Sequence, residues 1–187
     1  MTPWFPLATE RLLLRDFLPE DEAAIYEYAS DPAVVRFADW GPSDIATVRA
    51  NLHRRLGDQK TWPRESIEAA VELRSDNYLI GVLRITMVDR ANGTADFGYT
   101  FNRRYWNNGY ATEAIRALLH LAFSSLNLHR VWATCDVRNY GSYRVMEKLG
   151  MRREALFKKD VLQKGEWRDS YLYAVLAEEW DWASTRS

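Results

Sequence analysis

The residues best suited to chemistry lie where a strand-like segment meets a helix-like one, in the run Trp106-Asn-Asn-Gly-Tyr-Ala111. The first turn of a helix leaves about four backbone N–H groups unpaired and carries partial positive charge, so it favours a phosphate or pyrophosphate. Gly109 permits close approach of the backbone, and Ala111 keeps the first turn narrow. Any strand–loop–helix junction offers the same groups, so this run alone is only a weak indication of an anion site.

The segments on either side of this junction have the periodicities needed to hold it in place. Upstream, Phe97, Tyr99 and Phe101 alternate along the chain as in a strand. Downstream, apolar residues recur at spacings of three and one, which places them on one face of a helix: Ala111, Ala114, Ile115, Leu118, Leu119, Ala122, Phe123 and Leu126. We therefore predict a strand, a short loop and a helix, with the loop as the candidate anion site.

The rest of the chain alternates between strand and helix patterns. Strands are predicted over residues 11–16, 66–73, 78–88, 94–101, 131–136, 152–162 and 166–176. Helices are predicted after Pro19, from a cap at Ser43 to Gly57, over 111–126 and 139–150, and over 178–183. Short turns make neighbouring strands antiparallel, whereas 131–136 follows a helix and is predicted to run parallel to an earlier strand.

These patterns predict one mixed α/β (α+β) domain over residues 1–187, with a core of about 9–178. Its twisted, mostly antiparallel sheet would have about seven strands, with helices on both faces. The apolar fraction of 47% is sufficient for one well-buried core, and a net charge of −1 gives no electrostatic case for nucleic acid.

Composition also limits the cofactors and the compartment. The single cysteine, Cys135, excludes an internal disulfide, and the three histidines lack metal-ligand spacing, so we expect no metal. The first residues do not resemble a signal peptide, and no apolar run reaches the ~18 residues of a membrane span. We therefore expect a cytoplasmic protein that does not bind a membrane.

Four motifs follow one another along nearly the whole chain. They are Thr9-Glu-Arg-Leu-Leu-Leu-Arg15, Ala95-Asp-Phe-Gly-Tyr99, Tyr105-Trp-Asn-Asn-Gly-Tyr-Ala-Thr-Glu-Ala114 and Asn139-Tyr-Gly-Ser-Tyr-Arg-Val-Met-Glu-Lys-Leu-Gly-Met151. In this order they resemble the GNAT superfamily of acyl-CoA-dependent N-acyltransferases, and most closely its Rim-type branch of ribosomal-protein N-terminal acetyltransferases. The resemblance implies a GNAT-like fold, acetyl-CoA as co-substrate, and direct attack of an amine on the thioester.

In that family the pyrophosphate loop has three fixed positions, which here are Trp106, Gly109 and Ala111. Trp106 departs from the general Gln or Arg but suits this branch. Asn107 and Asn108 replace the usual Gly and the basic or amide residue of the branch. Asn adopts left-handed backbone angles more readily than other non-Gly residues, so we expect the loop to keep its conformation with less charge complementarity to pyrophosphate.

The resemblance assigns the cofactor-binding and catalytic positions. The strand Tyr99–Phe101 would pair with the pantetheine like an added edge strand, and the Tyr99 N–H would stabilise the oxyanion. Ser142 would donate to the departing thiolate, with Tyr140 and Tyr143 as alternatives, because Met146 replaces the tyrosine that many members use. The implied cofactor-binding residues are Tyr99, Phe101, Trp106, Asn107, Asn108, Gly109, Tyr110, Ala111, Thr112, Asn139 and Ser142.

For several charged or nucleophilic residues, the sequence leaves two alternative roles open. Asp96 is a candidate base acting through water or a partner for a nearby arginine or backbone group, and Asp160 is a second candidate base or a solvated acid. Cys135 is either a nucleophile or a buried thiol that lines the cleft, and the second reading is favoured. Glu113 favours the helix start electrostatically. The remaining cations either contact the cofactor phosphates or are exposed to solvent, and they are Arg103, Arg104 and Lys148.

The resulting prediction is an acetyl-CoA-dependent N-acetyltransferase acting on a primary amine, with a protein N-terminal α-amine as the first-choice acceptor. The alternatives are a small-molecule amine such as an antibiotic or polyamine, a larger acyl group, and a non-catalytic acyl-CoA-binding module. The acceptor would bind against the first two helices, residues 59–64 and the last hairpin, where Trp40, Trp62 and Trp167 occur. Whether the protein is a monomer or a homodimer stays open.

Overall fold

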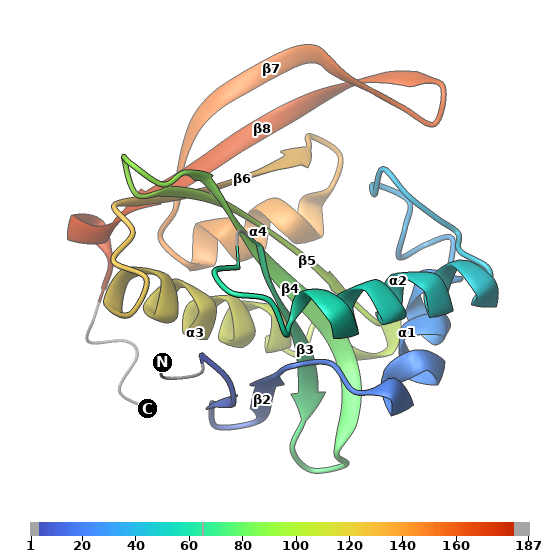
Figure 1. The fold of residues 1–187 in the computed structure, drawn as a ribbon. Helices are drawn as coiled ribbons and strands as arrows, with labels where there is room; N and C mark the ends of the chain where they lie inside the picture. Colours follow the sequence, from blue (N-terminus) through green and yellow to red (C-terminus); the bar gives the residue numbers. More distant parts are fainter. Residues whose placement is uncertain (1–3, 65, 182–187) are drawn as a thin grey trace.

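Within residues 4–64 and 66–181, which the computed structural model describes, eight strands form one sheet in the order β1-β2-β3-β4-β5-β6-β8-β7 (Figure 1). The strands are β1 (Leu7–Ala8), β2 (Leu12–Arg15), β3 (Ser66–Leu73), β4 (Tyr78–Asp89), β5 (Thr94–Phe101), β6 (Arg130–Asp136), β7 (Arg152–Gln163) and β8 (Glu166–Leu176). Only β5 and β6 pair in parallel, and the other neighbours are antiparallel. The mixed, mostly antiparallel sheet is thus confirmed, and the extra strand is β1, which is too short to show a period of its own.

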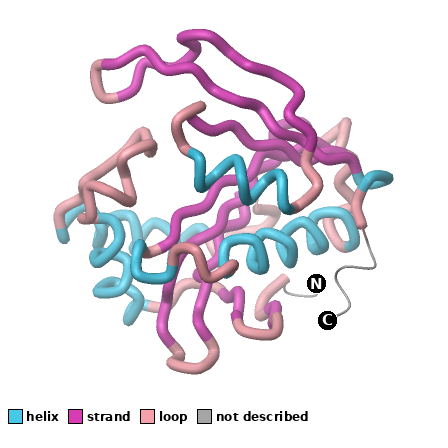
Figure 2. Tube along the Cα trace, turned by 180° about the vertical axis from the view of Figure 1, so that it is seen from behind, coloured by secondary structure: helices cyan, strands magenta, loops and turns pink. Residues whose placement is uncertain are grey.

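Four α-helices cover the two faces of this sheet (Figures 1 and 2). They are α1 (Glu22–Ala29), α2 (Ile45–Asp58), α3 (Tyr110–Ser124) and α4 (Tyr140–Lys148). The helix predicted at 178–183 is a single 3-10 turn over Ala177–Glu179, and its predicted end lies outside the described residues. Within the described part of the chain, no helix is both long and apolar enough to cross a bilayer.

The limits of α2 differ from the sequence prediction at both ends. Its cap is Asp44, whose carboxylate accepts a hydrogen bond from the Thr47 N–H at 2.8 Å, rather than Ser43. A carboxylate at this position also favours the positive end of the helix dipole. Gly57 does not end the helix, which continues to Asp58.

Separate apolar clusters hold the helices to the two faces. On one face, Ile25, Val48 and Leu52 of α1 and α2 pack with Leu79 and Val82 of β4. On the other, the predicted stripe of α3 is buried against the sheet and against Met146 of α4. Because consecutive strand residues point to opposite faces, Ala95 and Phe97 lie on the α3 face while Asp96 lies on the face of α1 and α2.

An ion-pair network fixes the end of β6 to β8. The buried Asp136 carboxylate accepts hydrogen bonds from Arg138 Nε at 2.9 Å and from Arg168 at 2.9 Å. Although burial works against its ionisation, the hydrogen bonds from Arg138 and Arg168 hold the pKa of Asp136 well below its usual value. The Arg168 side chain is itself only 10% exposed, and its second carboxylate partner, Glu166 at 3.4 Å, is mostly exposed.

Replacement of Asp136 by Asn should therefore destabilise the protein at pH 7 by about 3 kcal/mol, because it leaves a largely buried arginine with only the exposed Glu166 carboxylate, at 3.4 Å, as a counter-charge. The carboxylate has a depressed pKa in the folded state, so its contribution exists above about pH 4 and is lost as the pH falls through the folded-state pKa. Urea unfolding should show a difference from wild type at pH 7 that shrinks as the medium is acidified. Asp160→Asn, on an exposed residue of β7, is the control, and equal losses for the two variants would contradict the assignment.

Candidate active site

The parallel pairing between β5 and β6 stops after three positions, the last of which joins Asp96 to Trp132. From there β5 continues to Phe101 and β6 continues to Asp136, and the two strands diverge (Figure 1). Among the described residues, no strand pairs with β5 on this side beyond Asp96. An open strand edge of this kind can accept another extended chain through its backbone hydrogen bonds.

The register of β4 and β5 tells which backbone groups face the open side. The Asn102 N–H donates to the Ile80 carbonyl of the β4 side at 2.8 Å. In an antiparallel pair, positions that exchange hydrogen bonds alternate with positions that do not. The N–H groups of Tyr99 and Phe101 therefore point away from β4, and the Phe101 carbonyl accepts a hydrogen bond from Trp106 Nε1 at 2.8 Å. This places the Tyr99 N–H in the region where the strands diverge.

The loop before α3 has the conformation that its sequence predicts. Asn107 and Gly109 have left-handed backbones, with φ of 62° and 81°. Asn108 donates from its side-chain amide to the Trp106 carbonyl at 3.0 Å, which tightens the turn. Gly109 is the cap residue and offers no side chain to the first turn. The N–H groups at the start of α3 thus remain available for an anion beside the open edge of β5.

An arginine from the first motif secures this loop. Arg11 donates to the Asn108 carbonyl at 3.0 Å, pairs with Glu113 at 2.6 Å, and stacks on the Tyr110 ring at 4.6 Å. Thr9 also donates to Glu113, at 2.6 Å. Although desolvation works in the opposite direction, hydrogen bonds from Thr9 and Arg11 lower the pKa of Glu113. Glu113 therefore joins the β1–β2 turn to α3, and Arg11 brings a guanidinium next to the loop.

Three neutral polar side chains meet between β5, β6 and α4. The Tyr99 hydroxyl donates to Ser142 Oγ at 3.2 Å, and Asn139 caps α4 by accepting from the Ser142 N–H at 3.2 Å. Burial raises the pKa of Tyr99 above its usual value. Burial also raises the pKa of Cys135 to about 11, although a hydrogen bond with Ser142 opposes the rise. At neutral pH this cysteine is a thiol, so the geometry does not supply a thiolate nucleophile.

The candidate bases lie outside this group. Asp96 pairs with Arg84 at 2.7 Å, on the sheet face opposite to Tyr99. Asp160 is exposed on β7. Of the two roles predicted for Asp96, the structure shows the ion pair with a nearby arginine, which is Arg84.

The other residues considered for catalysis or for phosphate binding lie as follows. Tyr140 and Tyr143 contact each other edge to face at 5.2 Å, with Tyr140 mostly exposed. Met146 is fully buried in the core, so this position faces the sheet. Arg103 and Arg104 pair with Asp31 and Glu27, and Lys148 is exposed on α4.

Two segments far apart in sequence meet at the tip of the last hairpin. Gln163 donates to the Phe37 carbonyl at 3.1 Å, and Lys164 donates to the Val35 carbonyl at 2.7 Å. The tip of the β7–β8 hairpin therefore touches the connection between α1 and α2, and in Figure 1 the hairpin extends toward the side of the molecule where this connection lies. Sequence reasoning grouped these segments but did not foresee their contact, because no local pattern records it.

Comparison with known proteins agrees with this geometry. Residues 11–152 match the Acetyltransferase (GNAT) domain. The uncharacterized N-acetyltransferase YnaD of Bacillus subtilis (strain 168) is 40% identical over 176 residues, which cover 94% of this chain and 99% of that protein. The crystal structure of the GNAT-family acetyltransferase from Bacillus anthracis is 38% identical with a TM-score of 0.84, covering 92% of this chain and 99% of that one.

A relative with a named acceptor is more distant. The ribosomal protein uS5-alanine N-acetyltransferase of Escherichia coli (strain K12) is 28% identical over 106 residues, covering 56% of this chain and 55% of that protein. The family match extends from the first motif through α4, and it includes both the diverging strands and the loop before α3. The chain therefore belongs to the GNAT family of N-acetyltransferases.

Proposed function

We propose that this N-acetyltransferase moves an acetyl group from acetyl-CoA to a protein N-terminal α-amine in the cytoplasm. The observation that carries the donor side is the open edge of β5, which lies next to the unpaired N–H groups at the start of α3. One feature fits an extended amide chain and the other fits a pyrophosphate, and acyl-CoA contains both groups in sequence.

Each part of the donor has residues of matching chemistry. The pyrophosphate would bind the backbone from Asn107 to Thr112, with Arg11 supplying positive charge that the two asparagines lack. The pantetheine amides would pair with the Tyr99–Phe101 edge. Contacts to the rest of the cofactor would come from the neighbouring side chains Trp106, Asn108, Tyr110, Ala111, Asn139 and Ser142.

Acetyl-CoA supplies a thioester that an amine can attack directly. The backbone N–H of Tyr99 would donate to the carbonyl oxygen, which gains negative charge as the new C–N bond forms. Ser142 Oγ would donate to the sulfur as the C–S bond breaks, and the Tyr99 hydroxyl fixes its orientation. Because Cys135 stays protonated, direct attack is preferred over a route through an acetylated cysteine.

The proton of the amine would leave through water on the face that carries Asp96. Asp96 pairs with Arg84 and lies on the sheet face opposite to the Tyr99 side chain, so it would act on the amine through water and not by direct contact. An α-amine has a pKa near 8 and is partly neutral at pH 7, whereas a lysine amine near 10.4 needs a stronger base. An acceptor that is already partly neutral depends less on a base that acts through water, which favours an α-amine over a lysine side chain, in line with the protein acceptor of the uS5-alanine relative.

Variants of Ser142 and Cys135 distinguish direct attack by the amine from a route through an acetylated cysteine. We expect Ser142→Ala to lower kcat about a hundredfold with little change in acetyl-CoA affinity, because it removes a group that acts on the leaving sulfur. Cys135→Ala should keep kcat within about threefold, since a thiol with a raised pKa takes no part in bond formation. Thiol release over time measures kcat, and calorimetry with acetyl-CoA measures the affinity for the co-substrate. A loss of activity in Cys135→Ala as large as in Ser142→Ala would overturn direct attack.

The acceptor class is decided by parallel assays of thiol release. Peptides beginning with Ala or Ser should turn over, and the same peptides with a blocked α-amine and a free lysine should not. Spermidine and an aminoglycoside represent the small-amine alternative, and turnover with these alone would replace the protein N-terminus as acceptor. Binding of acetyl-CoA without turnover of any amine would instead support a non-catalytic acyl-CoA-binding role.

A further inference from the structure

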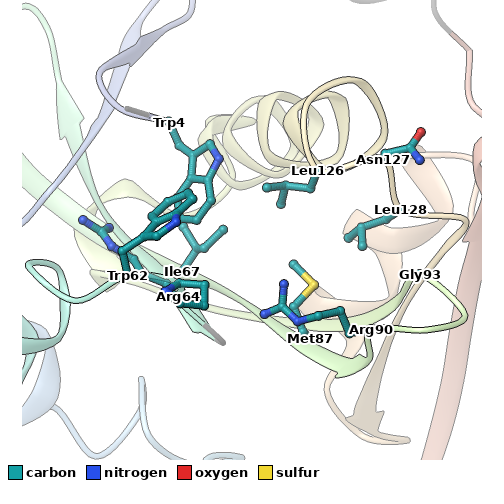
Figure 3. Close-up of a pocket in the computed structure, with 11 residues that line it drawn as sticks. Trp4, Trp62, Arg64, Ile67, Met87, Arg90, Gly93, Leu126, Asn127 and Leu128 are labelled. Atoms are coloured by element: carbon teal, nitrogen blue, oxygen red, sulfur yellow. The ribbon is translucent and has the colours of Figure 1, made fainter. Parts of the chain in front are cut away.

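A cavity of about 250 Å³ lies at the opposite end of α3 from the candidate active site (Figure 3). It is lined by Leu126, Asn127 and Leu128, which follow the helix directly. With 15 residues, α3 is about 22 Å long, so the cavity and the loop at Gly109 are separated by the length of the helix. A molecule in this cavity would not overlap one bound at the start of α3.

The walls of the cavity are aromatic and apolar. Trp4 and Trp62 come from distant parts of the chain, and their rings lie 4.8 Å apart and tilted by 36°. Ile67 of β3 and Met87 of β4 line the cavity between the two indoles and the residues that follow α3, as Figure 3 shows. Trp62 lines this cavity while remaining 52% exposed, and its predicted place on the acceptor surface stays a prediction. A flat apolar ring is the shape that such walls contact best.

The charged side chains that line the cavity, among the described residues, are cationic. Arg64 lies over the Trp4 ring at 5.8 Å and pairs with Asp16 at 2.9 Å, while its Nε is buried without a hydrogen-bond partner. Arg90, at the lower rim in Figure 3, forms no ion pair with any described residue. No Asp or Glu within the described ranges lines the cavity. The lining therefore carries an excess of positive charge next to apolar walls.

We propose that this cavity is a second small-molecule site that takes an aromatic carboxylate. The ring would lie against Trp4 and Trp62, and the carboxylate would pair with Arg90, which has no ion-pair partner among the residues that the structure describes. An apolar cavity of about 150 Å³ is large enough for benzene, so a cavity of about 250 Å³ has room for a one- or two-ring ligand. Guanidinium and carboxylate form charge-assisted hydrogen bonds, which give the site its preference for an acid over a neutral analogue.

The test is titration of the whole protein with 2-naphthoate, followed by calorimetry and by tryptophan fluorescence, in the presence of saturating acetyl-CoA. We expect one saturable site whose affinity does not change with the acetyl-CoA concentration. Trp62→Ala should weaken binding by about tenfold or more through loss of ring contact. Trp167→Ala is the matched control, because Trp167 is 60% exposed and lies outside the cavity.

The charge is tested separately, in a variant that leaves the walls intact. Arg90→Gln should weaken 2-naphthoate binding by about tenfold, while the neutral 2-naphthylmethanol should bind wild type and Arg90→Gln equally. Absence of 2-naphthoate binding at millimolar concentration would overturn the proposal. Displacement of 2-naphthoate by acetyl-CoA, or equal affinity in wild type and Arg90→Gln, would overturn it as well. Since the readout is binding, its failure would leave the acetyltransferase assignment unaffected.

Discussion

The structure depends on the point at which β5 and β6 stop pairing. Each strand is held along its other edge, β5 by β4 and β6 by β8, so neither can move to close the space between them. The Asp136 network adds to this restraint at the far end of β6. On the side away from β4, the backbone groups of Tyr99 and Phe101 consequently have no strand partner within residues 4–64 and 66–181. An enzyme that must bind an amide chain in extended form obtains a binding edge in this way without an additional element.

The helix that connects β5 to β6, α3, places the anion-binding N–H groups beside the open strand edge. A parallel pair needs a crossover, and α3 provides it on one face of the sheet. Its first turn must then lie close to the end of β5, because only a short loop separates them. The buried stripe fixes the helix on the sheet, and the contacts of Arg11 with Asn108 and Glu113 fix its first turn. The same crossover carries the chain past the cavity at its far end, where Leu126 and Leu128 contribute to the lining.

Much of the fold can be predicted from local sequence patterns. The features that cannot be predicted in this way are contacts between residues far apart in the sequence. The stripe from Ala111 to Leu126 predicts α3, and Asn107 adopts the left-handed backbone that its residue type favours. The pairing of Arg11 with Glu113 joins residues 102 positions apart, and no periodicity records it. The contact between Trp62 and Trp4 is of the same kind. The sequence also leaves the two readings of Asp96 open, since the register that brings Arg84 beside it is set by the turn between β4 and β5.

The central claim is that the open edge of β5 binds acyl-CoA, and amide hydrogen exchange followed by NMR tests it most directly. Gly98 and Thr100 point their N–H groups toward β4, whereas Tyr99 and Phe101 point theirs toward the diverging side. In the free protein, the amides of Tyr99 and Phe101 should exchange faster than those of Gly98 and Thr100. Addition of CoA should slow exchange at Tyr99 and Phe101 and in the loop from Asn107 to Thr112. Unchanged exchange at Tyr99 and Phe101 with saturating CoA would contradict the account.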